Sequence, residues 1–219
     1  MSKRVAVILS GCGFKDGAEI HESVLTLLAL DRAGADVTVA SIDRPQAKVT
    51  DHHAGRDVAE RRNVLTESAR IARGPVREVR ELRAAEFDAV VLPGGFGAAL
   101  NLCDFGVKGA ECVVDESVSA FLREMHRLGR PIGAICIAPA LVARLFGADL
   151  HPQLTIGSDA GTAAALEKMG ARHVKTPVDG IAVDARHKIV TTPAYMLAKS
   201  IKEAAAGIEK LVQKVIELS

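Results

Sequence analysis

The sequence contains no tryptophan and a single tyrosine, and aromatic residues make up only 3% of its 219 residues. Charge of one sign is also lacking, because 28 Lys and Arg residues stand against 27 Asp and Glu residues. Nucleic-acid binding needs basic side chains for the phosphates and favours aromatic rings for the bases. We therefore expect no nucleic-acid partner.

Long hydrophobic runs and a dense cysteine framework are missing as well. The first apolar run covers only residues 5–9, which is too short for a signal peptide core or a transmembrane helix. The few cysteines are scattered along the chain, as in proteins of a reducing compartment; they are Cys12, Cys103, Cys112 and Cys136. The sequence predicts a cytoplasmic protein with free thiols and no membrane partner.

The chain does have the composition of a globular protein, with 48% apolar and 25% charged residues. Its length fits one domain over residues 1–219.

Short apolar runs, typical of buried strands, alternate with segments of helical periodicity. The runs lie at residues 4–9, 35–40, 87–92, 131–135, 154–156, 181–183 and 189–191. The first expected helix lies between the first strand and Gly34. The other expected helices cover about 64–73, 115–128, 139–146, 162–169 and 196–218. This alternation predicts an α/β fold, a mainly parallel sheet with helices on both faces.

Cys136 is the sharpest chemical feature of the sequence. It follows an apolar strand and precedes a helix with no turn residues between them, the arrangement of a nucleophile elbow. Backbone N–H groups and the positive end of the helix would favour its thiolate. A buried structural cysteine is the competing interpretation, since cysteine is among the most buried residue types.

Glycines end the strand at residues 87–92. Gly94 and Gly95 can turn backbone N–H groups toward the same edge of the sheet, and with the N–H of Ile137 they could form an oxyanion hole. An ordinary tight turn between strand and helix is the more common meaning of adjacent glycines.

Glu22 lies in the first expected helix, at the border of the apolar stripe that Val24, Leu27 and Leu28 form. Acidic residues near a helix start often serve only the helix dipole, and this explanation suffices for Glu19. A buried Glu22 could instead be held neutral and donate a hydrogen bond to a thiolate.

His52 and His53, adjacent in a polar segment, are more simply solvated than metal-bound. Tyr195, after another strand, lines the same crevice or merely packs.

Together, these features resemble the ThiJ/PfpI superfamily, relatives of the class I glutamine amidotransferases. Within it, several segments look like the ElbB (enhancing lycopene biosynthesis) group, and the resemblance runs from residue 4 to about 218. The segments are residues 7–13, 16–22, 93–99, 136–140, 154–157 and 189–197. The resemblance implies a flavodoxin-like three-layer sandwich and a glyoxalase that uses no metal or other cofactor.

The same resemblance implies the roles of the site residues. Cys136 would add to a small aldehyde, Glu22 would move the protons, and the amides of Gly95 and Ile137 would bind the oxyanion. The product would be a hydroxy acid made from a 2-oxoaldehyde such as glyoxal. A homodimer is left open.

One departure from the superfamily concerns histidine. Many members carry a histidine shortly after the helix that follows the cysteine, and residues 154–159 contain none. His151 precedes this strand and does not take the role. The departure weakens an amidase or amidotransferase function, in which histidine normally activates the thiol. A non-enzymatic alternative is a redox-responsive or partner-binding protein that uses an oxidisable Cys136.

Overall fold

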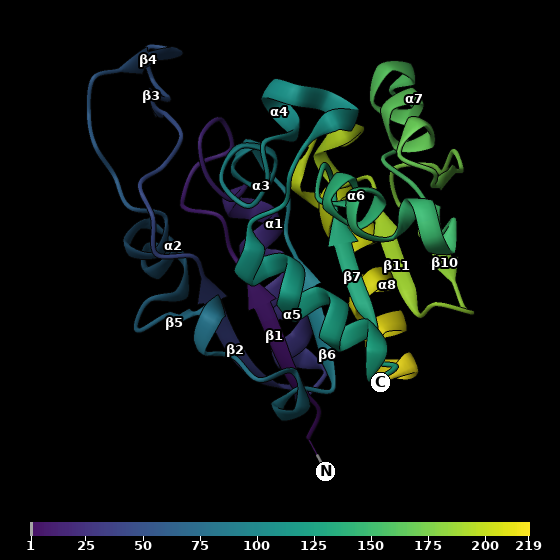
Figure 1. The fold of residues 1–219 in the computed structure, drawn as a ribbon. Coiled ribbons are helices and arrows are strands. Elements are labelled where there is room, and N and C mark those ends of the chain that lie inside the picture. The colour runs from purple at the N-terminus through teal and green to yellow at the C-terminus, as the bar shows by residue number, and fades with distance from the viewer. Residues whose placement is uncertain (1) are drawn as a thin grey trace.

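A seven-stranded sheet forms the middle of the molecule in the computed structural model, which describes residues 2–219 (Figure 1). Its strands are β1 (Arg4–Ile8), β2 (Asp36–Ser41), β5 (Arg77–Glu78), β6 (Ala89–Leu92), β7 (Ile132–Ile135), β10 (Ala182–Asp184) and β11 (Ile189–Thr192). Their order is β10-β11-β7-β6-β1-β2-β5, and only β10 runs antiparallel to its neighbour. Strand β10 therefore forms an antiparallel edge of an otherwise parallel sheet.

The remaining elements cover this sheet or lie at its edges. The helices are α1 (Ile20–Arg32), α2 (Val64–Ala72), α3 (Phe96–Leu100), α4 (Phe105–Lys108), α5 (Glu116–Arg127), α6 (Pro139–Leu150), α7 (Ala160–Lys168) and α8 (Ile201–Leu218). Two small sheets pair β3 (Val49–Asp51) with β4 (Arg56–Val58), and β8 (Gln153–Leu154) with β9 (Arg172–His173). Short 3₁₀ turns are η1 (Val79–Glu81), η2 (Ala84–Glu86), η3 (Gly109–Glu111) and η4 (Ala194–Met196).

Alternating side chains of the strands feed two separate cores, as the period of two in a β-strand requires. Along β1, Val5 and Val7 pack with α1 and α8 on one face, while Ala6 and Ile8 pack with α5 and α6 on the other (Figure 1). All four side chains are fully buried. The three layers confirm the predicted flavodoxin-like α/β sandwich.

Three predictions about individual elements are wrong. The last helix begins at Ile201 with Ser200 as its N-cap, not at Met196, which lies in η4. The polar segment before α2 contains the hairpin of β3 and β4, which the sequence pattern did not indicate. In α1 the buried face holds Glu22, Ser23 and Thr26 as well as apolar residues, whereas Val24 and Leu28 are exposed. Apolar periodicity therefore located α1 but not the face that it buries.

Among the described residues, no helix has the length and apolar character that crossing a bilayer requires.

The N-cap of α5 offers a test of local stability. Asp115 accepts hydrogen bonds from the backbone N–H of Ser117 at 3.0 Å and of Val118 at 3.4 Å, as an N-cap side chain does. Asp115→Ala should lower the free energy of unfolding by about 1 kcal/mol, because two helix donors lose their acceptor. Urea titration measures this loss. Glu116→Ala removes a neighbouring acidic side chain that is not the cap and should change stability by less than about 0.5 kcal/mol.

Candidate active site

Cys136 lies in the turn between β7 and α6, directly after the last residue of β7. Its backbone adopts φ +61°, a left-handed conformation that is rare for a residue other than glycine. Its N–H donates to the carbonyl of Thr192 at the end of β11, at 2.9 Å. The side chain is only 7% exposed. The sharp turn expected between strand and helix is therefore present, and it fixes the sulfur over the carboxyl ends of the strands.

Gly94 leaves the space in which Cys136 and Glu22 meet. A Cβ atom at Gly94 would lie 2.5 Å from the Cβ of Cys136 and 2.7 Å from Oε2 of Glu22, closer than non-bonded atoms approach. The N–H of Gly94 donates to Oε2 of Glu22 at 2.9 Å. This corrects one sequence prediction, because the Gly94 amide binds the carboxyl group and is not a free oxyanion donor.

The amides of Gly95 and Ile137 instead face the sulfur of Cys136 and lower the pKa of its thiol. Gly95 is the N-cap of α3 and adopts φ +91°, where a side chain would collide with the backbone of Glu19. The structure thus brings together, beside one sulfur atom, the two amides that the sequence predicted as oxyanion donors.

Glu22 is completely buried, and its carboxyl group lies over the end of β7. Oε2 accepts from Gly94, which follows β6, and Oε1 accepts from the N–H of Tyr195 at 3.2 Å, after β11. These strands lie on either side of β7, so the carboxyl is held from both sides of Cys136. The side chain also borders Gly94 together with that of Cys136.

Burial, together with the nearby charge of Glu19, raises the pKa of Glu22 from its ordinary value of 4.5 to about 8. The N–H groups of Tyr195 and Gly94 and the Cys136 thiol lower it, but by less. A carboxyl with this pKa carries its proton at neutral pH and can donate it. The prediction of a buried, neutral Glu22 fits this environment.

The thiol of Cys136 differs from the expectation for a helix N-terminus. Burial and the charge of Glu22 raise its pKa well above 9.0, and the amides of Gly95 and Ile137 offset only part of this effect. A neutral Glu22 exerts no such repulsion. The positive end of α6 is therefore insufficient by itself, and the protonation state of Glu22 decides how readily the thiolate forms.

His21 and Tyr195 form a polar contact at the border of this site. Nδ1 of His21 lies 2.8 Å from the hydroxyl oxygen of Tyr195, at hydrogen-bonding distance. The sequence placed Tyr195 near the crevice, but it gave no indication of His21, which lies on the exposed side of α1. His151 lies at the opposite end of α6 from Cys136 and contacts the carbonyl of Gly170.

Other candidate residues lie outside the site. Cys12, Cys103 and Cys112 are free thiols, as predicted. His52 contacts the carbonyl of Thr50 at 3.0 Å and is exposed. Within residues 2–219, no three His, Cys, Asp or Glu side chains are arranged to hold a metal ion.

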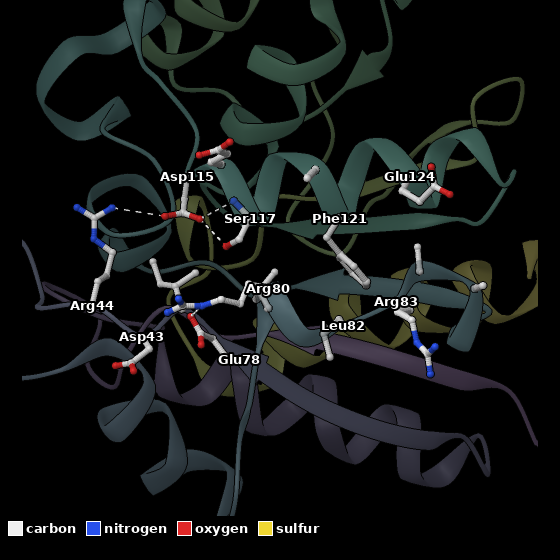
Figure 2. Close-up of a pocket in the computed structure, with 16 residues that line it drawn as sticks. Asp43, Arg44, Glu78, Arg80, Leu82, Arg83, Asp115, Ser117, Phe121 and Glu124 are labelled. Carbon is white, nitrogen blue, oxygen red and sulfur yellow. Dashed lines mark hydrogen bonds and ion pairs between the residues drawn. The ribbon is translucent and has the colours of Figure 1, made fainter.

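A cavity of about 720 Å³ lies apart from these residues, between α5 and the segment that carries η1 and η2 (Figure 2). Charged side chains line it, and four of them form two ion pairs: Arg44 with Asp115 at 3.6 Å, and Arg80 with Glu78. None of the predicted site residues is among the residues that line it. The cavity is therefore separate from the cysteine site.

The chain is similar to known proteins in sequence and in structure. The sequence model of the DJ-1/PfpI family matches residues 3–196. A human protein, "Glutamine amidotransferase-like class 1 domain-containing protein 3, mitochondrial", is 45% identical over 226 residues, which cover 99% of this chain and 83% of the human one. The "ES1 protein, mitochondrial" of Danio rerio is 32% identical over 88% of this chain and 76% of its own.

A solved structure is also similar over nearly the full length. It is an isoprenoid biosynthesis protein with an amidotransferase-like domain from Ehrlichia chaffeensis, with a TM-score of 0.91 and 36% identity, covering 98% of this chain and 99% of its own. Sequence and fold therefore lead to the same conclusion. The chain belongs to the DJ-1/PfpI family.

Proposed function

We propose that this protein is an ElbB-like glyoxalase that converts small 2-oxoaldehydes, such as glyoxal, into hydroxy acids. The observation that carries the proposal is the Glu22 carboxyl, which is buried, borders Gly94 together with Cys136 and is raised in pKa to about 8. A carboxyl with this pKa can both give and accept a proton near neutral pH, as a proton shuttle must.

The reaction begins when the Glu22 carboxylate takes the proton of the Cys136 thiol and the sulfur attacks the aldehyde. The sulfur forms a bond to the aldehyde carbon while the electron pair of the C=O double bond moves to oxygen. The amides of Gly95 and Ile137 can stabilise this oxyanion, which then takes the proton of Glu22. The result is a hemithioacetal beside a Glu22 carboxylate.

Glu22 then moves a proton between the two carbons of the substrate. The carboxylate takes the proton from the carbon bonded to sulfur, and an enediolate forms. Glu22 returns this proton to the neighbouring carbon, while the hydroxyl proton passes from the first oxygen to the second. This internal redox step turns the sulfur-bound carbon into a thioester and the other carbonyl into an alcohol. Water adds to the thioester, its proton passes through Glu22 to the departing sulfur, and the hydroxy acid is released.

The site requires no further group for this chemistry, so the proposal includes neither metal nor other cofactor. The partner that it implies is a small aldehyde, because Cys136 is only 7% exposed. A cytoplasmic location and a homodimer stay predictions.

The alternative of an oxidisable Cys136 finds less support. Burial covers the sulfur and raises the pKa of its thiol, which opposes oxidation and aldehyde addition alike. The two functions differ in Glu22, because oxidation of Cys136 leaves the proton-shuttling environment of this carboxyl without a purpose.

Substitution of the two central residues tests the proposal. Purified protein without metal or glutathione should convert glyoxal to glycolate, and Cys136→Ala should abolish this turnover. Glu22→Gln should reduce it by roughly 10²-fold or more, because an amide cannot shuttle protons. Alkylation of Cys136 by iodoacetamide should fall only modestly in Glu22→Gln.

Cys12→Ala serves as the control thiol, and glutamine and methylglyoxal serve as comparison substrates. Wild-type turnover in Cys136→Ala or Glu22→Gln would contradict the mechanism.

The pH dependence of turnover should report the coupled pair of Glu22 and Cys136. The active pair holds one proton, so kcat/KM should rise with pH up to about 8, where the first proton leaves. Well below that pH, the rate should change about tenfold per pH unit. Activity should persist above pH 9.0, since burial raises the pKa of Cys136 well beyond that value. A profile that is flat between pH 6 and 8 would exclude this assignment.

Stability should depend on pH in the opposite direction. Between pH 4.5 and about 8, Glu22 is ionised in the unfolded chain but protonated in the folded one, so wild-type stability falls as pH rises. Each unit of pKa difference corresponds to about 1.4 kcal/mol.

Glu22→Gln lacks this titration. From pH 5 to pH 8, its free energy of unfolding should therefore gain about 4 kcal/mol relative to wild type. Chemical denaturation at both pH values measures the change, and Glu116→Gln, an exposed glutamate of α5, should show no comparable gain.

A further inference from the structure

Tyr195 contacts two successive residues of α1 with two different groups. Its backbone N–H donates to Oε1 of Glu22 at 3.2 Å, and its ring hydroxyl lies 2.8 Å from Nδ1 of His21. Since His21 and Glu22 are neighbours in the first turn of α1, Tyr195 holds this turn at two points. The carbonyl of Thr192, shortly before, accepts from the N–H of Cys136.

The backbone that presents the Tyr195 N–H is strained. Ala194 is fully buried and adopts φ +42°, a conformation that costs a non-glycine residue free energy unless its surroundings impose it. The hydrogen bonds of η4, such as Met196 to Pro193 at 2.9 Å, hold this turn from within. The contact between the Tyr195 hydroxyl and His21 attaches it to α1 from outside.

The other anchor of Glu22 needs no such support. Gly94 follows β6 directly, and its carbonyl accepts from the N–H of Glu19 at 3.0 Å, next to its own contact with Glu22. Of the two amides that bind the carboxyl, only that of Tyr195 belongs to a residue whose side chain reaches back to the same helix.

We propose that Tyr195 and His21 act together as positioning residues that hold the carboxyl of Glu22 over Cys136. The proposal rests on the proposed function, in which Glu22 moves the protons. Neither residue needs to touch the substrate, because their effect passes through the Tyr195 N–H.

The consequence concerns the pH at which Glu22 loses its proton. The titratable groups around its carboxyl are Glu19 at the start of α1, Cys136 after β7 and Tyr195 in η4, with His21 behind Tyr195. The Tyr195 N–H lowers the pKa of Glu22 by stabilising the carboxylate. A loosened Tyr195 would therefore raise this pKa above about 8.

Nuclear magnetic resonance of protein labelled with ¹³C at the glutamate carboxyl tests this directly, and Glu22→Gln identifies the resonance. In Tyr195→Phe, which keeps the ring and loses the hydroxyl, Glu22 should titrate about 0.5 to 1 unit higher than in wild type. His21→Ala should give a similar shift. His21→Gln, whose amide can still bond to the hydroxyl, should shift less, and His53→Ala, an exposed histidine outside the site, should not shift.

Turnover provides a second readout. At pH 7, kcat with glyoxal should fall about three- to tenfold in Tyr195→Phe and recover toward wild type at pH 9, while KM stays unchanged. An unchanged Glu22 titration in both Tyr195→Phe and His21→Ala would overturn the proposal. Equal shifts in His21→Ala and His21→Gln would also overturn it.

The two levels of the argument fail separately. If wild-type protein does not convert any of the aldehydes, the glyoxalase function is wrong, but the carboxyl titration still decides whether Tyr195 and His21 position Glu22. If turnover is present and the titration is unmoved, only the positioning role is wrong.

Discussion

A carboxyl group without access to water is the constraint around which the candidate active site is built. Ionising Glu22 inside the protein is unfavourable, so its surroundings must supply what water would otherwise supply. Two amides do so, from Gly94 and Tyr195, at 2.9 and 3.2 Å. Because they follow β6 and β11, the order of strands in the sheet places the carboxyl over the strand between them, which carries Cys136.

This dependence explains why the neighbouring backbone tolerates so little change. A methyl group at Gly94 would occupy the space between the sulfur and the carboxyl, and one at Gly95 would strike the start of α1. Gly94 serves close approach alone, whereas Gly95 also adopts φ +91°, which favours glycine. The sulfur of Cys136 and the carboxyl of Glu22 thus lie close together because Gly94 and Gly95 have no side chains. They meet at the edge of the sheet where the parallel strands end.

The sequence was sufficient for the sheet, because buried strands such as residues 132–135 are short, apolar and flanked by helical patterns. It was also sufficient to bring Cys136, Glu22, Gly95 and Ile137 to one edge, since parallel strands share the edge at which they end. It could not assign the Gly94 amide to Glu22, because the direction of an amide depends on tertiary packing.

His21 escaped prediction for a similar reason. It is an exposed residue on a helix, and its partner Tyr195 lies 174 positions along the chain. The face of α1 was mistaken because its buried positions include Glu22, Ser23 and Thr26, which look polar in a hydrophobicity pattern. The serine and threonine hydroxyls donate to backbone carbonyls of α1, at 2.6 and 2.7 Å, which makes their burial tolerable.

The left-handed backbone of Ala194 has an implication for laboratory evolution. Glycine would adopt φ +42° with less strain, yet the position carries alanine inside the turn that presents an amide to Glu22. A library selected for heat resistance alone would gain nothing from keeping this turn or the buried acid beneath it. Under such a selection, substitutions should accumulate first in this site while the sheet stays intact. The positions that change in the enriched variants would therefore identify the functional residues.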